Sequence, residues 1–369
     1  MADIQTTICG IGFPNPVWTA AGPTGASARM LLLAAEAGAG GLVAKTLSVH
    51  PARVPIPNIT SPFPGSLLNA EQWSEINYQH FIDTELRAVR HCGVPVIASV
   101  GYTPEELRIL GKALDHTGLV DAIEFSIHYI DKDPENLRLT AEALRRSTSM
   151  PVLAKLSPAI NDLEAAVNIL DPLVDGYVAI NSLGPALDFD IETLEPYLGS
   201  EDGRGWLSGR AILPVGLHFV AGIAGLTKKP VIGVGGIRSV EDVIKYIMAG
   251  ASAVQICSAA ILQGGKIYRR LTDGLQHWMD KHGYRDIEHL RGAFHRRPER
   301  KMYLLGEGPQ LYPVLNEASC TYCDLCVRAC MYQAIWFAEK AFNLDKGKCV
   351  SCGLCTSVCA QGALRMIER

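Results

Sequence analysis

The chain alternates between short apolar runs and longer stretches in which apolar residues recur every three or four positions. The short runs have the character of buried strands, and the longer stretches have the spacing of helices that bury one face. Several helical stretches begin at a capping residue or Pro and end at Gly, as bounded helices do. The predicted strands are residues 17–21, 41–46, 94–100, 122–127, 151–156, 176–181, 230–235 and 253–258. The predicted helices include residues 26–38, 104–118, 134–147, 161–170, 240–250 and 261–283.

Strands that alternate with helices in this way predict an α/β fold with a parallel sheet. Over residues 17–283 the alternation fits a (β/α)8 TIM barrel better than an open sheet. An open doubly wound sheet shows the same alternation, because periodicity does not reveal whether the first and last strands pair. In a barrel the chemistry belongs at the C-terminal ends of the strands, so side chains there are the first candidates for a site.

The composition excludes several functional classes. The chain has 369 residues, of which 48% are hydrophobic and 20% are charged, enough for one large domain and a small one. A net charge of −4 without a long basic run gives no reason to expect nucleic acid. The start of the sequence has no leader-like pattern, and no window reaches the length of a transmembrane helix. We therefore expect a cytosolic protein without membrane insertion.

The seventh and eighth predicted strands end in residues suited to phosphate. Gly235 and Gly236 let an anion approach backbone N–H groups without a Cβ in the way, and Cys257 and Ser258 begin a helix whose first amides attract an anion. A tight turn alone also explains a lone glycine pair. Two such sequences at neighbouring strand ends favour a phosphate site.

Other predicted strand ends are polar where a core is usually apolar. Two lysines directed toward one barrel mouth indicate an anionic cofactor, such as a flavin whose reduced ring carries negative charge. For any one of these side chains alone, a structural hydrogen bond explains its presence equally well. The polar residues are Lys45, Thr46, Glu124, Ser126, Lys155, Asn181 and Ser182.

Eight of the eleven cysteines lie in two runs near the end of the sequence, CTYCDLCVRAC and CVSCGLCTSVC. Each run is C-x2-C-x2-C-x3-C, in which three thiolates hold one iron–sulfur cluster and the fourth binds the other cluster. A zinc ribbon uses two C-x2-C pairs and leaves the remaining cysteines without a role. We expect one [4Fe-4S] cluster on Cys320, Cys323, Cys326 and Cys359, and a second on Cys349, Cys352, Cys355 and Cys330. The expected domains are a flavin-binding barrel at 1–285, a linker at 286–318 and a two-cluster ferredoxin-like domain at 319–369.

A flavin barrel joined to such a module resembles the dihydroorotate dehydrogenase superfamily, most closely the FMN and iron–sulfur part of dihydropyrimidine dehydrogenases. The resemblance is carried by 15-NPVWTAAGPTG, 43-VAKT, 67-LLNAE, 154-AKLSP, 180-INSLG, 205-GWLSGRAILP, 233-GVGGI and 256-ICSAA, in the family's order. It implies that FMN lies against Ala21, Gly22, Lys45, Thr46 and Lys155, with its phosphate on Gly209, Gly235, Gly236, Cys257 and Ser258. It also implies substrate contacts from Asn69, Asn181 and Ser182.

The fourth predicted strand departs from the family's Asn-Leu-Ser-Cys-Pro motif. Ser126 stands in the place of the substrate-binding asparagine, and Tyr129 in the place of the proton-transferring cysteine. We expect Tyr129 to transfer the proton, with His128 second and Asp131 third, since each has an ionisable side chain near the flavin in this alignment. Strand alternation instead places His128 on the face of Ser126. A third reading of Tyr129 is an aromatic residue that only packs in a rebuilt loop.

These features predict an FMN- and iron–sulfur-dependent oxidoreductase that acts on a C=C or C–C bond next to a carbonyl or amide of a small-molecule substrate. No G-x-G-x-x-G sequence opens a strand–helix unit, so electrons are expected to pass through the clusters to an NAD(P)H-oxidising flavoprotein subunit or a soluble ferredoxin. The resemblance implies a homo-oligomer or a hetero-oligomer. The alternative is an electron-relay subunit whose barrel has lost its chemistry. Asn69 and Asn181 favour the enzyme, and the changed segment 126–131 favours the relay.

Overall fold

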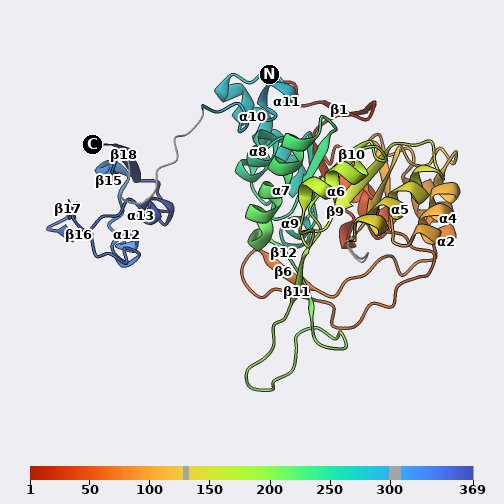
Figure 1. Ribbon diagram of the computed structural model, residues 1–369, viewed down its shortest axis with the longest axis horizontal. Coiled ribbons are helices and arrows are strands. Elements are labelled where there is room, and N and C mark those ends of the chain that lie inside the picture. Colours follow the sequence, from red (N-terminus) through yellow and green to blue (C-terminus); the bar gives the residue numbers. More distant parts are fainter. Residues whose placement is uncertain (128–132, 299–308, 369) are drawn as a thin grey trace. The chain divides into compact units, whose positions relative to one another are not determined.

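Two units make up the chain, Met1–Arg297 and Pro298–Arg369. They are seen in a computed structural model that describes residues 1–127, 133–298 and 309–368 (Figure 1). The segment 286–318, expected to be a linker, contributes to both units. Ile287 and Leu290 are buried in the core of the first unit, and Leu311–Leu315 forms a strand of the second.

Eight parallel strands form the barrel of the first unit, in the order β3-β14-β13-β10-β9-β8-β7-β4. The first and last strands meet at a parallel bridge between Trp18 and Gly41, where the backbone N–H of Thr19 donates to the Gly41 carbonyl at 3.1 Å. The predicted TIM barrel is therefore confirmed. Its strands are β3 (Val17–Thr19), β4 (Leu42–Val43), β7 (Val96–Val100), β8 (Ala122–Ser126), β9 (Val152–Leu156), β10 (Gly176–Ala179), β13 (Val231–Val234) and β14 (Ala253–Ile256).

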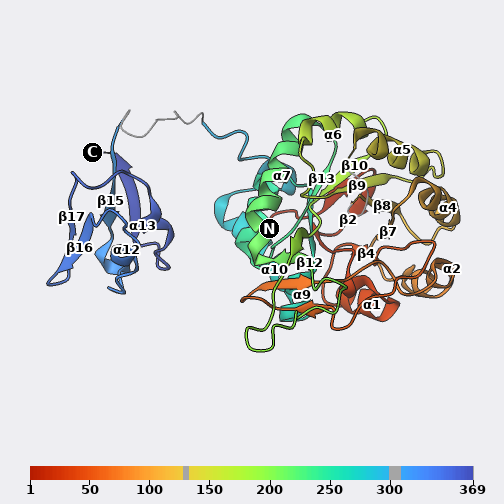
Figure 2. The same cartoon turned by 60° about the horizontal axis from the view of Figure 1, so that its bottom comes forward.

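Helices surround the barrel, as Figure 2 shows. Local sequence sets their ends: Thr103 and Glu106 form a capping box at the start of α4, and Ser239 and Asp242 form one at the start of α8. The stretch 261–283, predicted as one helix, is two helices, because Gly264 has φ +77° and ends the first of them. No helix in the described part of the chain is long and apolar enough to cross a membrane. The helices are α1 (Ala28–Glu36), α2 (Tyr78–His80), the π-helical η2 (Phe81–Leu86), α3 (Arg87–Val89), α4 (Pro104–Leu114), α5 (Pro134–Arg145), α6 (Leu163–Leu170), α7 (Leu213–Leu226), α8 (Val240–Met248), α9 (Ser258–Gln263), α10 (Ile267–His282) and α11 (Ile287–Leu290).

The barrel interior is apolar at its N-terminal end. A hairpin of β1 (Thr6–Ile8) and β2 (Ile11–Phe13) contributes Ile8 and Phe13 to this cluster, and the Phe13 ring stacks on Trp18 at 4.1 Å between centroids. We call the cluster the lower layer. From the strands it takes Trp18, Val43, Ile97, Ala122, Leu153, Val178, Ile232 and Ala253.

On each barrel strand, the residue two positions after the lower-layer residue points to the same side of the sheet, because strand side chains alternate. Five of these positions are polar and buried, and we call them the polar layer. They are Lys45, Ser99, Glu124, Lys155 and Gln255. The alternation thus places charged groups directly above the apolar lower layer, from which water is excluded.

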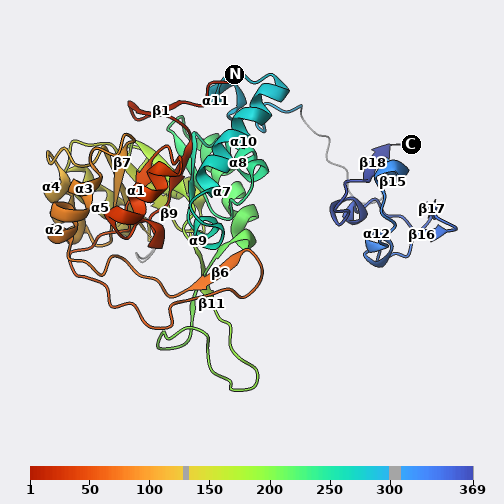
Figure 3. The same cartoon turned by 180° about the vertical axis from the view of Figure 1, so that it is seen from behind.

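A second, four-stranded antiparallel sheet lies at the C-terminal ends of the barrel strands, in the order β11-β12-β6-β5. It was not predicted from the sequence. The segment between β11 and β12 extends away from the barrel (Figures 1 and 3). The strands of this antiparallel sheet are β5 (Ile59–Thr60), β6 (Ser66–Asn69), β11 (Leu183–Ala186) and β12 (Gly205–Gly209).

The second unit is small and contains all the clustered cysteines. Its core is Ile335, Cys355 and Leu364, around which the two cysteine runs are wrapped. Each run carries a one-turn helix. The elements are β15 (Leu311–Leu315), paired antiparallel with β18 (Leu364–Glu368), the hairpin β16 (Ile335–Ala338) and β17 (Ala341–Leu344), and the helices α12 (Leu325–Arg328) and α13 (Leu354–Ser357).

Candidate functional site

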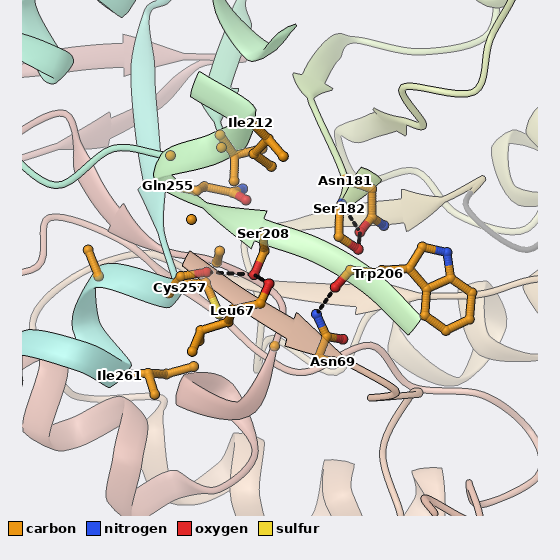
Figure 4. A pocket seen from close by; sticks show the side chains of 18 of the residues that line it. Leu67, Asn69, Asn181, Ser182, Trp206, Ser208, Ile212, Gln255, Cys257 and Ile261 are labelled. Carbon is orange, nitrogen blue, oxygen red and sulfur yellow. Dashed lines mark hydrogen bonds between the residues drawn. The ribbon is translucent and has the colours of Figure 1, made fainter. Parts of the chain in front are cut away.

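A cavity of about 320 Å³ opens at the C-terminal ends of the barrel strands. Its walls come from the strand ends and from β6 and β12 of the antiparallel sheet (Figure 4). This volume is within the range of cofactor and ligand sites. The position is the one at which TIM barrels place their chemistry.

The cavity brings together most of the residues predicted for a site. Lys45 and Ser126 are buried beside it without lining it. The predicted proton-transferring residues Tyr129, His128 and Asp131 lie outside the described residues. The predicted residues that line the cavity are Ala21, Gly22, Thr46, Asn69, Lys155, Asn181, Ser182, Gly209, Gly235, Gly236, Cys257 and Ser258.

At one end of the cavity lie two glycine positions that a residue with a Cβ could occupy only with strain and overlap. Gly209 has φ +78°, and a Cβ there would lie 2.5 Å from the Gly65 carbonyl oxygen. Gly236 has φ +76°, and its Cβ would lie 2.7 Å from the Leu213 backbone nitrogen. Exposed backbone of this kind lets an anion approach N–H groups closely, so this end fits the phosphate of FMN. The hydroxyl of Ser258 donates to the hydroxyl of Ser208 at 2.9 Å, and both residues line the cavity.

Cys257 lines the cavity between this end and Gly22. Its Sγ lies 2.9 Å from the point where a Cβ on Gly22 would be, so any larger residue there would collide with the sulfur. Burial raises the pKa of the Cys257 thiol, and the Lys155 ammonium opposes the rise. A neutral thiol adds no negative charge that would repel a phosphate.

A buried ionic group from the polar layer brings two of its members, Lys155 and Gln255, to the lining of the cavity. The Lys155 ammonium donates to Glu124 Oε1 at 3.2 Å, and the Gln255 amide donates to Glu124 Oε2 at 2.7 Å. Glu124, Lys155 and Gln255 are 0%, 4% and 1% exposed. A buried charge is tolerated only when it is paired and hydrogen-bonded, and here each carboxylate oxygen has a donor.

Lys45 is paired as well, with carboxylates that sequence reasoning missed. Its ammonium lies 2.8 Å from Glu71 Oε2 and 2.9 Å from Glu75 Oε2, while the lysine is 3% exposed. Glu71 lines the cavity. Lys45 does not line the cavity and Glu71 does, so this side of the cavity presents a carboxylate rather than an ammonium.

The other end of the cavity carries fixed amides and hydroxyls. The Asn69 amide donates to the Trp206 carbonyl at 2.9 Å, and the Asn181 amide donates to Ser126 Oγ at 3.3 Å. Asn181 Oδ1 accepts from the backbone N–H of Ser182 at 2.8 Å (Figure 4). These bonds hold the amides in place and leave part of their donor and acceptor capacity for a ligand.

The cysteine unit has a cavity of its own, lined by Cys330, Cys349, Cys352 and Cys355. This is the set expected for the second cluster. Burial raises the pKa of the Cys355 thiol to about 11, and the neighbouring Cys352 and Cys349 add to the rise. Crowded thiols of this kind release their protons when iron binds them.

Three members of the first cysteine set, Cys320, Cys326 and Cys359, lie close enough to influence one another electrostatically. Partial burial raises the pKa of the Cys326 thiol, and Cys320 and Cys359 add to the rise while backbone N–H groups oppose it. The backbone N–H of Ala363 donates to Cys359 Sγ at 3.3 Å, a bond that stabilises a thiolate. Over the described residues, no three ligand side chains converge closely enough for a single metal ion.

Sequence reasoning missed Gln255 and Glu71. Gln255 is the one strongly polar side chain in the run AVQIC, and a polar residue inside a buried strand is a signal of a site. Glu71 gave no such signal, because it lies in an irregular segment whose contact with Lys45 appears only in the fold.

Two family models match the chain. The one described as dihydroorotate dehydrogenase matches residues 3–279, and the one described as a 4Fe-4S dicluster domain matches residues 319–363. Both matches agree with the barrel and the cysteine unit.

Curated relatives give the same result. The dihydroorotate dehydrogenase B (NAD(+)) catalytic subunit of Thermoplasma acidophilum is 32% identical over 303 residues, which cover 79% of this chain and 99% of the relative. The subunit of the same name from Thermoplasma volcanium is 33% identical over 308 residues, 80% of this chain and 100% of the relative. That of Pyrococcus furiosus is 31% identical over 300 residues, 78% of this chain and 98% of the relative. The chain thus belongs to the dihydroorotate dehydrogenase family, as a flavoprotein oxidoreductase in which a 4Fe-4S dicluster domain follows the barrel.

Proposed function

We propose that the barrel binds FMN and oxidises or reduces a carbon–carbon bond next to a carbonyl or amide. The observation that carries the proposal is one cavity lined by a glycine cradle, by Lys155 and Gln255 of the group held by Glu124, and by fixed amides. FMN bound there would supply hydride transfer. The protein supplies the anchoring of the phosphate, an ammonium beside the ring, and the hydrogen bonds that orient the substrate.

The charges at the substrate end favour an uncharged amide or imide ring over a carboxylate. Lys45 is already neutralised by Glu71 and Glu75, and Glu71 faces the cavity, so a carboxylate there would meet a like charge. Glu71 instead accepts hydrogen bonds from ring N–H groups, and Asn69 and Asn181 bind carbonyl and N–H groups together. Dihydroorotate, after which the relatives are named, carries a carboxylate. A dihydropyrimidine-like ring without that carboxylate fits the charges of this cavity.

The proton transfer remains a proposal from the sequence. We assign it to Tyr129, with His128 and Asp131 as the next candidates, because a phenol near an enolate-forming carbon is a competent acid. Ser126 would bind the substrate through Asn181, with which it is hydrogen-bonded at 3.3 Å.

Electrons would leave or enter through two [4Fe-4S] clusters, one on Cys320, Cys323, Cys326 and Cys359 and one on Cys330, Cys349, Cys352 and Cys355. The gathered thiols of both sets support this assignment. The relatives are named as catalytic subunits of NAD(+)-linked enzymes, which supports a separate NAD(P)H-oxidising flavoprotein subunit as the partner. A soluble ferredoxin is the other candidate carrier.

The test is an anaerobic reaction of the reduced, cluster-loaded protein with matched pairs of compounds. Uracil and orotate differ by one carboxylate, as do dihydrouracil and dihydroorotate in the reverse direction. We expect rapid reoxidation of the reduced flavin by uracil and slow reoxidation by orotate. Starting from the oxidised protein, we expect dihydrouracil to reduce the flavin faster than dihydroorotate does. Both differences in rate should be smaller in Glu71→Gln. A preference for orotate would contradict the charge argument. If every compound failed while an external flavoprotein still exchanged electrons with the clusters, the relay function would replace the enzyme.

A further inference from the structure

Gln255 carries a buried side-chain amide at the floor of the cavity, and in the described part of the chain this amide makes one hydrogen bond, to Glu124. It lies on β14, is 1% exposed and lines the cavity (Figure 4). Its oxygen Oε1 has no hydrogen-bond partner within the described residues, although it is buried. A buried acceptor without a donor is destabilising, so such an atom usually has a ligand or a water as its partner.

The orientation of the amide is set by its neighbour. An ionised carboxylate only accepts hydrogen bonds, so the group that Gln255 turns toward Glu124 must be its NH2. Glu124 Oε2 accepts that bond at 2.7 Å, and Glu124 Oε1 accepts from Lys155 at 3.2 Å. The same carboxylate therefore fixes both side chains and directs Oε1 of Gln255 away from itself.

The cavity lining therefore contains one fixed donor, the Lys155 ammonium, and one fixed acceptor, Gln255 Oε1. The Lys155 ammonium and the Gln255 oxygen both belong to cavity-lining residues, and both are held by Glu124. A flavin offers matching groups, namely ring carbonyls that accept, and a ring N3–H and ribityl hydroxyls that donate. We propose that Gln255 Oε1 accepts a hydrogen bond from a donor group of the bound flavin, and that Glu124 is the positioning residue for this contact. The inference rests on the proposed FMN site and deepens it.

The experiment measures FMN dissociation constants by flavin fluorescence on the full, cluster-loaded chain. In Gln255→Met the acceptor is lost while the side-chain length is kept, and we expect FMN to bind roughly tenfold more weakly. Two probes identify the donor: FMN methylated at N3, and a set of FMN analogues that each lack one ribityl hydroxyl. The analogue without the relevant donor should bind wild type and Gln255→Met equally.

Gln263 offers a matched control. It also lines the cavity, but its Oε1 already accepts from Arg270 at 2.6 Å, so Gln263→Met should not change the ratio of analogue to FMN affinity. In Glu124→Gln, the ratio of analogue affinity to FMN affinity should move toward the value found in Gln255→Met. If Glu124 had only a structural role, its replacement would lower thermal stability and leave this ratio unchanged.

Unchanged FMN affinity in Gln255→Met would overturn the inference and assign the acceptor to a water. Weaker FMN binding that persists equally with every analogue would also overturn it, because no flavin donor would then be coupled to Gln255. Failure of the wild-type protein to bind FMN would remove the proposed function itself, and the inference with it.

Discussion

Replacing Gly209 by Ala tests whether the cavity depends on close backbone contact between β12 and β6. Gly209 pairs with Ser66 and has φ +78°, which costs an L-residue about 1–2 kcal/mol. The new Cβ would also lie 2.5 Å from the Gly65 oxygen and 2.8 Å from Ser66 Cα, and forced overlap of this kind costs about 1–3 kcal/mol more. We expect a total loss of about 2–5 kcal/mol in the free energy of unfolding.

The assay is thermal unfolding followed by circular dichroism, in which each kcal/mol corresponds to about 2–4 °C. Gly93→Ala is the control, because Gly93 has φ +87° and nothing within 4 Å of its Cβ position. It carries a positive φ without the overlap, so a larger loss of stability in Gly209→Ala than in Gly93→Ala reports the close approach. Gly209→Ala should also weaken FMN binding, and Gly93→Ala should not. Equal stability of the two variants would refute the reasoning.

The remaining predictions concern the charges, the clusters and the proton. Lys45→Met removes the partner of the buried Glu71 carboxylate and should cost about 3 kcal/mol of unfolding free energy, most of which Lys45→Met/Glu71→Gln should recover; no recovery would show that packing dominates. Cys359→Ala should remove about half of the iron measured per chain, whereas Cys92→Ala should leave it unchanged; equal iron contents would argue against the assigned ligand set. Tyr129→Phe should slow substrate turnover by about 10²–10⁴-fold while the flavin and cluster spectra stay the same, and unchanged turnover would remove Tyr129 from the mechanism.

The barrel could be predicted because each of its strands and helices is recognisable from neighbouring residues in the sequence. Each strand is a short apolar run between helices, so the period locates it, and eight such units favour a barrel. Closure itself is seen only in the structure, at the bridge between Trp18 and Gly41. The sheet of β5, β6, β11 and β12 could not be predicted this way. Its short strands lie in long irregular segments, and their pairing, such as Leu68 with Leu207, joins residues far apart in the sequence.

The same distinction applies to the site. The strand-end residues Asn181 and Gly235 were found because barrel geometry assigns chemistry to those positions. Their partners were not found, because the Glu124–Gln255 bond joins residues 131 positions apart and depends on the closed ring of strands. Lys45 shows the consequence most clearly: alone it suggested an anionic ligand, and with its carboxylate partners it indicates the opposite.

The two levels of the barrel interior also bear on how such a protein can diversify. The lower layer, sealed by the β1–β2 hairpin, joins the strands by packing alone, and the polar layer above it contributes the buried ionic group. Mutations in the polar layer can therefore alter recognition while the apolar packing of the lower layer stays intact. Proteins with this fold can therefore change substrate through a few substitutions at and above the polar layer. Protein design can follow the same route by leaving the residues of the lower layer unchanged.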